Sequence, residues 1–524
     1  MGVPISWTAS PIIVEVPTWP WLAELSAAEG RQVSLADVPE TAWDAVLLPG
    51  VDVVWLMGVW ERSPAGRALA RADQGVRAAA AAVLPDVTDA DIVGSPYCVH
   101  RYVVDDHLGG PTGLAAARAQ LARRGVGLLV DFVPNHVAID HPWIVERPDL
   151  FVRGTPDDLA REPHAFFDTV HGVVANGRDP YFPPWTDVAQ LDSTKQALRD
   201  AVADTLLDIS EQADGVRCDM AMLLLDDVVV RTWVGRIGLP PPHPYWSELI
   251  GRVRAVHPGF GFVAEAYWDR ESDLIAQGFD HCYDKRLTDR LLHEDADSVR
   301  AHLGAAPSYQ GHLVRFLENH DEARVASVVD DARNWAASIT VATLPGALML
   351  FERQWDGWRV RPPVQLGRRP VESVDESFAE LWERLLSIVA DDRLRAGAWT
   401  LLDVAGWPDN QSCRCLVAWQ WLATTATAPG SPSGPAMASP GRHVVVVNLS
   451  DQPAAGRVLL DAVAGSAITL VDRLTGTTYE RDGDEVAADG LFVSLGSWGA
   501  HLFAADVRSL ASAQVDVTQA DGTR

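Results

Sequence analysis

The sequence is poor in cysteine and in positive charge, and it has no long apolar run. Its 524 residues contain five cysteines, an odd number with no C-x-x-C pair, which excludes a disulfide framework and a cysteine-rich zinc site. We expect reduced, mostly buried thiols and no resident metal. The formal net charge of −28 argues against binding to nucleic acid or to an anionic membrane surface. We therefore expect a neutral partner.

Signals for export or membrane insertion are also missing. No apolar run reaches the roughly 18 residues of a membrane span, and no basic residue precedes Arg31. We therefore expect a cytoplasmic protein, and nothing in the sequence decides its oligomeric state. A hydrophobic fraction of 48% and a charged fraction of 22% are typical of a folded chain, whose length allows two or three domains.

Eight short β-branched runs alternate with longer helical stretches up to about residue 352. This alternation is typical of parallel strands joined by crossover helices. Eight such units predict an α/β fold, a closed (β/α)₈ TIM barrel with its chemistry on the loops after the strand ends. The runs are residues 11–19, 51–57, 127–132, 214–219, 261–266, 279–284, 312–318 and 345–351.

Two further regions interrupt or follow this pattern. Residues 137–192 are too long for one crossover and rich in Pro, Asp and aromatics, so we expect a small inserted subdomain after the third strand, within a barrel spanning 1–395. Residues 396–506 alternate strands without helices, which predicts a C-terminal antiparallel β-sandwich. We expect residues 424–442 to be a low-complexity loop and 507–524 to be a flexible tail.

Carboxylates stand at the ends of two predicted strands. Arg217 and Asp219 share one face of the fourth strand because side chains alternate with a period of two. A neighbouring cation is expected to lower the pKa of Asp219 and keep it ionised, as a nucleophile requires. Glu265 ends the fifth run among apolar residues, which is expected to raise its pKa and suit it to act as a general acid.

Two more polar groups follow the third and seventh runs. The segment 318–322 reads ENHDE, and Asp131, Asn135 and His136 lie at or after the third run. Each group alone could be a surface ion pair, a solvated rim residue or a helix cap. Polar groups at four strand ends of one barrel converge in space, however, and together they favour a barrel hydrolase.

These stretches resemble the four signature regions of the α-amylase family, glycoside hydrolase family thirteen, and especially its bacterial intracellular members. The matching segments occur in the family's order over about 200 residues: DFVPNH (131–136), GVRCDMA (215–221), FVAEAYW (262–268) and FLENHD (316–321). The segment SPY (95–97) also resembles the one that carries the family's sugar-stacking tyrosine.

The resemblance implies a role for individual residues. Asp219 is the implied nucleophile, Glu265 the general acid/base, and Asp321 the group that supports the distorted transition state. The implied substrate-binding residues are Tyr97, His136, Arg217 and His320, which would line the subsite of the attacked ring. Among four tryptophans that either stack on sugars or pack loops, Trp268 is the preferred stacking residue; the others are Trp143, Trp185 and Trp355.

The chain also departs from the family pattern. Met222 and Leu223 stand where starch-degrading members often carry Lys-His, which removes a lysine-based subsite and the cue for a calcium-binding carbonyl. Arg101 replaces a common Asp. Asn135 is a possible calcium ligand, but calcium takes six to eight oxygens, so we predict no required cofactor, with calcium as the alternative.

Three functions follow from these observations. We expect a retaining α-glycoside hydrolase, an enzyme that cleaves α-glucosidic bonds of short oligosaccharides derived from maltodextrin or glycogen. A transglycosylase or a phosphate-dependent glycosyltransferase of the same family would use the same covalent intermediate; Arg359 and Arg361 could hold a phosphate. A non-catalytic glycan-binding protein is the third possibility, although such proteins lose a carboxylate that this chain keeps.

Overall fold

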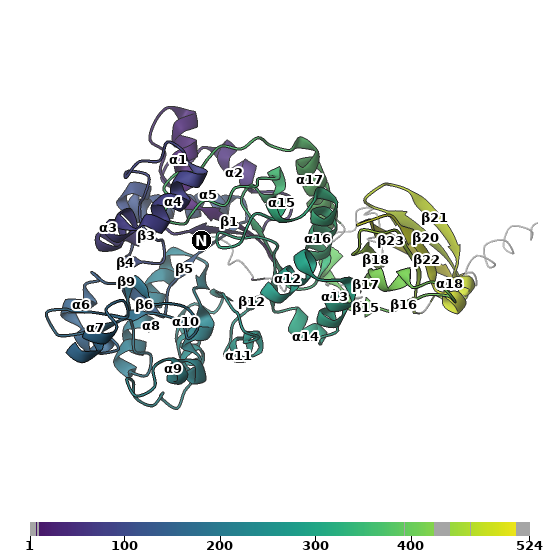
Figure 1. Cartoon of the computed structure of the whole chain (residues 1–524). Coiled ribbons are helices and arrows are strands. Elements are labelled where there is room, and N and C mark those ends of the chain that lie inside the picture. Colours follow the sequence, from purple (N-terminus) through teal and green to yellow (C-terminus); the bar gives the residue numbers. More distant parts are fainter. Residues whose placement is uncertain (1–6, 8–9, 392–393, 424–440, 462, 510–524) are drawn as a thin grey trace, which may run out of the picture.

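A computed structural model of the chain describes residues 7, 10–391, 394–423, 441–461 and 463–509. Eight parallel strands close into a barrel in the order β1-β14-β13-β12-β11-β10-β5-β2 (Figure 1). Each of the eight predicted runs contains one of these strands, so the predicted TIM barrel is confirmed. The strands are β1 (Ile12–Pro17), β2 (Val53–Met57), β5 (Gly127–Phe132), β10 (Gly215–Cys218), β11 (Gly261–Ala264), β12 (His281–Tyr283), β13 (Leu313–Arg315) and β14 (Ala347–Phe351).

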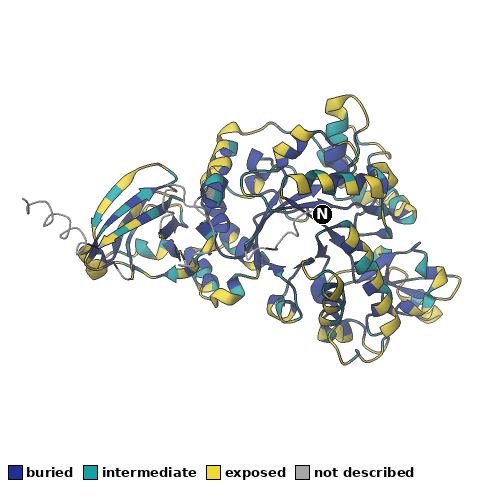
Figure 2. Cartoon of the chain, turned by 180° about the vertical axis from the view of Figure 1, so that it is seen from behind, coloured by how far each residue is buried: buried dark blue, intermediate teal, exposed yellow. Residues whose placement is uncertain are grey.

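Helices surround the barrel and turn an apolar face toward it. Figure 2 shows these helices buried on their inner faces and exposed on their outer faces, as amphipathic helices on a sheet must be. They are α1 (Thr18–Glu29), α2 (Glu40–Val46), α5 (Gly110–Arg123), α8 (Gln196–Gln212), α9 (Asp226–Thr232), α10 (Tyr245–Val256), α11 (Glu271–Ala276), α12 (Lys285–His293), α13 (Ala296–Leu303), α14 (Pro307–Gln310), α15 (Val325–Val328), α16 (Asp331–Thr343) and α17 (Glu376–Asp391). Two further helices, α3 (Pro64–Ala72) and α4 (Gln74–Val83), pack around a separate small core.

The alternation of side chains along each barrel strand separates two cores. In β1, Ile12, Val14 and Val16 pack outward in the core shared with the helices, whereas Ile13 packs in the barrel interior. Glu15 lies on the same face as Ile13 and is fully buried. A carboxylate is therefore carried into the barrel interior, where only a partner of opposite charge or a hydrogen-bond donor makes it tolerable.

The inserted region after the third barrel strand forms its own small sheet. Its strands are β6 (His136–Ala138), β7 (Phe166–Phe167), β8 (Val174–Gly177) and β9 (Trp185–Gln190), in the order β6-β9-β8-β7, with helices α6 (Trp143–Glu146) and α7 (Pro156–Arg161). A separate two-stranded ribbon, β3 (Trp60–Arg62) and β4 (Val99–Val104), follows the second barrel strand.

Two antiparallel sheets make up the C-terminal region, which Figure 1 shows beside α13 and α16. Apolar residues from both sheets form one core between them, as in a sandwich. The six-stranded sheet runs β15-β17-β18-β23-β20-β21 and the three-stranded sheet β16-β19-β22. The strands are β15 (Ala398–Leu402), β16 (Val404–Ala405), β17 (Leu416–Leu422), β18 (Arg442–Asn448), β19 (Ala454–Val458), β20 (Ser466–Asp472), β21 (Thr478–Asp482), β22 (Leu491–Leu495) and β23 (Ala500–Ser509).

Two details of the predicted C-terminal region were wrong. The region does contain a helix, α18 (Gly483–Asp489), whose first turn is capped by the Asp482 side chain. The tail does not begin at residue 507, because Val507 pairs with Ile468 and β23 continues to Ser509. Residues 424–440 of the predicted loop and 510–524 of the predicted tail lie outside the described residues.

No helix within the described part of the chain is long and apolar enough to cross a membrane. All five cysteines are free thiols; three of them, Cys98, Cys218 and Cys282, are buried, and Cys413 and Cys415 are half-buried.

Candidate active site

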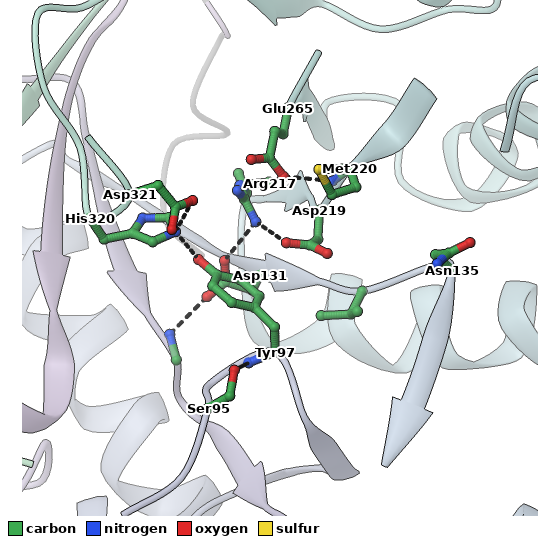
Figure 3. Close-up of polar contacts among 12 residues, drawn as sticks. Ser95, Tyr97, Asp131, Asn135, Arg217, Asp219, Met220, Glu265, His320 and Asp321 are labelled. Carbon is green, nitrogen blue, oxygen red and sulfur yellow. Dashed lines mark hydrogen bonds and ion pairs between the residues drawn. The ribbon is translucent and has the colours of Figure 1, made fainter. Parts of the chain in front are cut away.

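One guanidinium joins the two carboxylates at the centre of the barrel mouth (Figure 3). Arg217 is the third residue of β10, and Asp219 directly follows that strand. Nη1 of Arg217 donates to Oδ1 of Asp219 at 2.8 Å, and Nη2 lies 2.8 Å from Oε2 of Glu265, which directly follows β11. Because β10 and β11 pair in register, Asp219 and Glu265 stand side by side at adjacent strand ends.

The surroundings hold Arg217 in this position. Its guanidinium carbon lies 5.1 Å from the ring centre of Tyr97, 5.2 Å from that of Trp55 and 5.8 Å from that of Tyr283. Its side chain is 1% exposed. Such a cation, surrounded by aromatic faces and paired with two carboxylates, has little freedom to move away from either carboxylate.

Burial sets the protonation of the two carboxylates. Desolvation raises the pKa of Glu265 to about 7, although the Arg217 charge opposes it. This agrees with the expectation for a general acid. The prediction that Arg217 gives Asp219 a lowered pKa was wrong, because desolvation raises the pKa of Asp219 and outweighs the attraction of Arg217.

The loop after β13 supplies the third carboxylate. Burial disfavours the charge of Asp321, but the adjacent His320 cation more than compensates and lowers the pKa of Asp321 to about 2. Oδ2 of Asp321 lies 3.0 Å from Nε2 of His320, while the Asp321 side chain keeps 45% of its surface exposed. Asp321 is therefore an ionised carboxylate that is packed among charges at its base and open to a ligand at its tip.

His320 is the centre of a second polar cluster. Its Nε2 atom is 2.6 Å from the hydroxyl of Tyr97, and its Nδ1 atom is 2.5 Å from Oε1 of Glu15. Burial disfavours an imidazolium, yet the charges of Asp321 and Glu15 raise the pKa of His320 well above its ordinary value. The ring is thus held as a cation with a donor on each nitrogen.

His136 and Asp131 lie beside these clusters, with Oδ1 of Asp131 3.8 Å from Nη1 of Arg217. His136 begins β6 and is 5% exposed. Burial lowers its pKa to about 4, while a hydrogen bond with the backbone of Tyr97 acts in the opposite direction. Asp131 accepts a hydrogen bond at 2.7 Å from the N–H of Gly58, and burial raises its pKa to about 6 despite the nearby Arg217.

Gly58 allows this approach. Its φ of +76° is a left-handed conformation, and a Cβ at this position would lie 2.8 Å from Cβ of Pro96. Any other residue would meet both a strained backbone and a steric conflict with the segment that carries Tyr97.

The structure thus brings most of the predicted site residues into contact. Tyr97, Arg217, Asp219, Glu265, His320 and Asp321 form one connected cluster, with His136 on its edge. Trp268 is not part of that cluster; its ring stands edge-on to Tyr181 with centroids 4.8 Å apart.

Parts of the chain are similar in sequence to known α-amylases. No family model matches the chain. The α-amylase MalA of Haloarcula japonica is 28% identical over 253 residues, 45% of this chain and 33% of MalA. α-Amylase 3 of Dictyoglomus thermophilum is 20% identical over 276 residues, 48% of this chain and 52% of the relative. The chain therefore matches between a third and about half of the length of these relatives.

The fold is similar over nearly the whole chain to solved α-amylase structures. A noncanonic maltogenic α-amylase, AmyB of Thermotoga neapolitana, superposes with a TM-score of 0.64 at 16% identity, covering 96% of this chain and 99% of AmyB. The chain has the fold of an α-amylase.

The residues that depart from the α-amylase family pattern contact other parts of this protein. Met222 and Leu223 lie in the 3₁₀ helix η3 (Ala221–Leu224) and are 0% and 4% exposed, so both side chains belong to the core. Arg101 lies on β4 and pairs with Glu61, at 2.6 Å and 2.9 Å.

The residues do not fit the calcium ion that many α-amylase family members carry. Oδ1 of Asn135 accepts a hydrogen bond at 2.8 Å from Nε2 of Gln190, so the candidate ligand oxygen is already engaged. Within the described residues, no group of three or more His, Cys, Asp or Glu side chains is arranged to hold a metal ion.

The other candidate stacking tryptophans contact the protein itself. Trp143 stands edge-on to His141 at 4.9 Å, and Trp185 packs on His136 at 5.2 Å. Trp355 is 5% exposed and belongs to the main core.

Sequence reasoning missed several members of the site. Glu15 binds His320, Tyr267 donates to Oε1 of Glu265 at 3.1 Å, and the rings of Trp55 and Tyr283 flank Arg217. A signal for Glu15 was present, since it is the one charge in the apolar strand IIVEVP. An isolated charge in a buried strand needs a partner of opposite charge or a hydrogen-bond donor, so such a residue is a candidate member of a polar site.

Proposed function

We propose that the chain is a retaining α-glycoside hydrolase that cleaves α-glucosidic bonds of short neutral oligosaccharides. The observation that carries the proposal is the contact of one buried guanidinium with both Asp219 and Glu265, at 2.8 Å each. A retaining enzyme needs two carboxyl groups close together, about 5 Å apart, one as nucleophile and one that alternates between acid and base.

The first step transfers the sugar to the enzyme. The Asp219 carboxylate attacks the anomeric carbon, the glycosidic C–O bond breaks, and Glu265 gives its proton to the leaving oxygen. A Glu265 pKa of about 7 keeps a substantial protonated fraction at neutral pH. Arg217 favours the ionised form of Asp219 and so offsets part of the rise in pKa that burial causes.

The second step returns the sugar to water. Glu265, now a carboxylate, takes a proton from a water molecule whose oxygen attacks the anomeric carbon, and the ester bond to Asp219 breaks. Asp321 remains ionised throughout because its pKa is about 2, so its charge can stabilise the positive charge that develops on the ring. In this proposal Tyr97 and His320 contact that ring.

Product analysis tests this proposal. The full chain is incubated with maltopentaose, beside the Asp219→Asn variant, and the products are identified by mass spectrometry. We expect shorter maltooligosaccharides from the parent and none from the variant. Absence of products from maltopentaose and from other α-glucosides would contradict the proposal.

One observation favours transfer as a second candidate function. Nη1 of Arg361 donates to the backbone oxygen of Asp321 at 3.0 Å, and its charge contributes to the low pKa of that residue. Arg361 is exposed, whereas Arg359 pairs with Asp331 at 3.5 Å. A cation beside Asp321 could attract phosphate as an acceptor, so the same incubation with added phosphate should be examined for a phosphorylated sugar.

A further inference from the structure

Two glycines face the barrel interior at the amino-terminal ends of adjacent strands. Gly215 begins β10 and Gly261 begins β11, and the two are partners in the strand register. Because side chains alternate along a strand, Gly215 shares a face with Arg217 and Asp219. Gly261 shares a face with Glu265 for the same reason. Neither glycine has a φ in the left-handed region, so the backbone conformation does not itself require glycine.

The indole ring of Trp7 occupies the space that these glycines leave. A Cβ at Gly261 would lie 1.9 Å from Cε2 of Trp7, and its three nearest atoms would all belong to this ring. A Cβ at Gly215 would lie 2.4 Å from Cζ2 of the same ring. Trp7 packs against the apolar core of the barrel interior. At this end of β10 and β11 the interior is therefore filled by a residue that precedes the first barrel strand.

One backbone carbonyl connects the ring to both strands. Nε1 of Trp7 donates to the carbonyl oxygen of Asp214 at 3.0 Å, and the N–H of Gly261 donates to the same oxygen at 3.1 Å. The Asp214 carboxylate accepts a hydrogen bond at 2.9 Å from the N–H of Leu128 in β5 and pairs with Arg118 of α5 at 2.7 Å. Trp7 is thus bound at the point where β5, β10 and β11 are held together.

The same two strands end at the carboxylates that react in the proposed hydrolase. Asp219 stands four residues beyond Gly215, about 13 Å along the strand. Glu265 has the same spacing from Gly261. Arg217 contacts both carboxylates (Figure 3), and its side chain is 1% exposed. Because a close-packed interior transmits strain, a shift at the amino-terminal ends of these strands reaches both carboxylates.

We propose that Trp7 is a positioning residue whose ring fixes the amino-terminal ends of β10 and β11 and thereby the separation of Asp219 and Glu265. This inference rests on the proposed hydrolase function. Tyr97 and His320, which we propose to bind the sugar, lie on other segments. Loss of the ring should therefore lower kcat much more than it raises KM.

Steady-state kinetics on maltopentaose and thermal melts test the inference. A misplacement of about 1 Å costs on the order of 100-fold in rate, so Trp7→Ala should lower kcat about 10- to 100-fold and change KM less than about threefold. Trp7→Phe keeps a ring over both glycines and should recover most of the lost kcat. Trp7→Leu replaces Trp7→Ala if the latter does not fold.

Trp335→Ala is the matched control for lost packing. Trp335 is half-buried like Trp7, but it lies on α16 and packs against the core outside the barrel strands. Trp335→Ala should lower Tm, as Trp7→Ala does, and keep the parental kcat. An equal fall of kcat in both variants, or a parental kcat in Trp7→Ala, would overturn the positioning role and leave hydrolysis intact.

A double-mutant cycle tests whether the ring and the glycine act as one unit. Gly261→Ala should displace the ring and lower kcat as Trp7→Ala does, because the new methyl group needs the same space. The double variant Trp7→Ala/Gly261→Ala should be no worse than Trp7→Ala, because the methyl group then enters the vacated space. Losses that add in the double variant would overturn the inference.

Failure of the proposed function would give a different result. If the parent releases no sugar from any α-glucoside, hydrolysis fails, and crystal structures of the parent and of Trp7→Ala decide the inference. The readout is the pair of distances from Arg217 to Asp219 and to Glu265, 2.8 Å each. A change of more than about 0.5 Å in either distance in Trp7→Ala supports the positioning role, and unchanged distances overturn it.

Discussion

Oε1 of Glu15 lies 2.5 Å from Nδ1 of His320, although 305 residues separate them in the chain. Glu15 is fully buried and His320 is 2% exposed, so the contact is shielded from water. The opposite nitrogen of the ring faces Tyr97 and Asp321. Glu15 therefore sets the orientation and charge of His320, which we propose to bind the sugar.

Glu15→Gln should reduce activity without unfolding the chain. The amide keeps the shape of the side chain but removes the charge that stabilises the His320 cation. Hydrogen bonds to charged groups are worth about 1.5–3 kcal/mol, so kcat/KM on maltooligosaccharides should fall about 10- to 100-fold. Steady-state kinetics and circular dichroism measure the two effects, with exposed Glu29→Gln as the control. Parental kcat/KM in Glu15→Gln would contradict this role.

Tyr267→Phe should move the basic limb of the pH profile to higher pH. Burial raises the pKa of Glu265 to about 7, so activity that needs its proton should decline above that pH. The Tyr267 hydroxyl donates to Glu265 at 3.1 Å and favours the ionised form, and its removal raises the pKa of Glu265 further. The measurement is kcat/KM against pH, with Tyr479→Phe in the C-terminal sheet as the control. A basic limb displaced to lower pH would count against the assignment.

Glu265→Gln should be inactive on oligosaccharides yet more resistant to heat than the parent above pH 7. A raised pKa means that the folded state binds the Glu265 proton more tightly than the unfolded chain does. The parent therefore loses stability as pH rises through about 7, and a neutral glutamine avoids that loss. Thermal melts between pH 5 and 8 should show a Tm difference that narrows toward pH 5. A difference that widens toward low pH would refute the argument.

Asp284→Ala should destabilise the barrel. Burial raises the pKa of Asp284, but Arg315 and His302 outweigh it and give a lowered pKa. Removing this carboxylate leaves the fully buried Arg315 without the opposite charge of Asp284, at a cost of about 3–5 kcal/mol. Urea denaturation measures the loss. Asp295→Ala is the matched control, since Asp295 caps α13 as Asp284 caps α12 but is exposed, and it should cost about 1 kcal/mol.

The contribution of Asp284 to stability should depend on pH in the opposite direction to the contribution of Glu265. Its lowered pKa means that this contribution is complete above the ordinary Asp pKa and disappears as pH falls through the folded-state value. The difference in stability between the parent and Asp284→Ala should therefore shrink on acidification. A constant difference down to strongly acidic pH would show that lost packing, and not the ion pair, causes the effect.

The sequence predicts the barrel well because each strand has a recognisable pattern in its own residues. Runs such as 127–132 and 345–351 are β-branched or apolar, short and bounded by glycine or proline, and the polar residues at their ends need only the barrel topology to converge. Glu15 could not be paired from sequence, because its contact with His320 exists only once β1 has met the other barrel strands. The pKa of Asp219 was misjudged for a similar reason, since its neighbour Arg217 is visible in sequence and its depth of burial is not.

The C-terminal region shows where local patterns are weaker. The helix α18 has seven residues between two strands, too few to establish a helical period. The sequence also suggested an anion-binding role for two arginines without showing that only Arg361 reaches the backbone of Asp321. A cytoplasmic location remains a prediction from the sequence alone.

The pairing of β1 with β14 places Ile12 beside Leu348 and Glu15 beside Phe351. During synthesis β1 emerges first and its partner last, so one edge of the growing sheet stays unpaired until the final barrel strand has left the ribosome. Barrel closure then pairs two strands that lie far apart in the chain. Ordering the long segment between them costs conformational entropy. The contact of Glu15 with His320 joins the first barrel strand to the loop after the seventh, so the complete site requires the closed barrel.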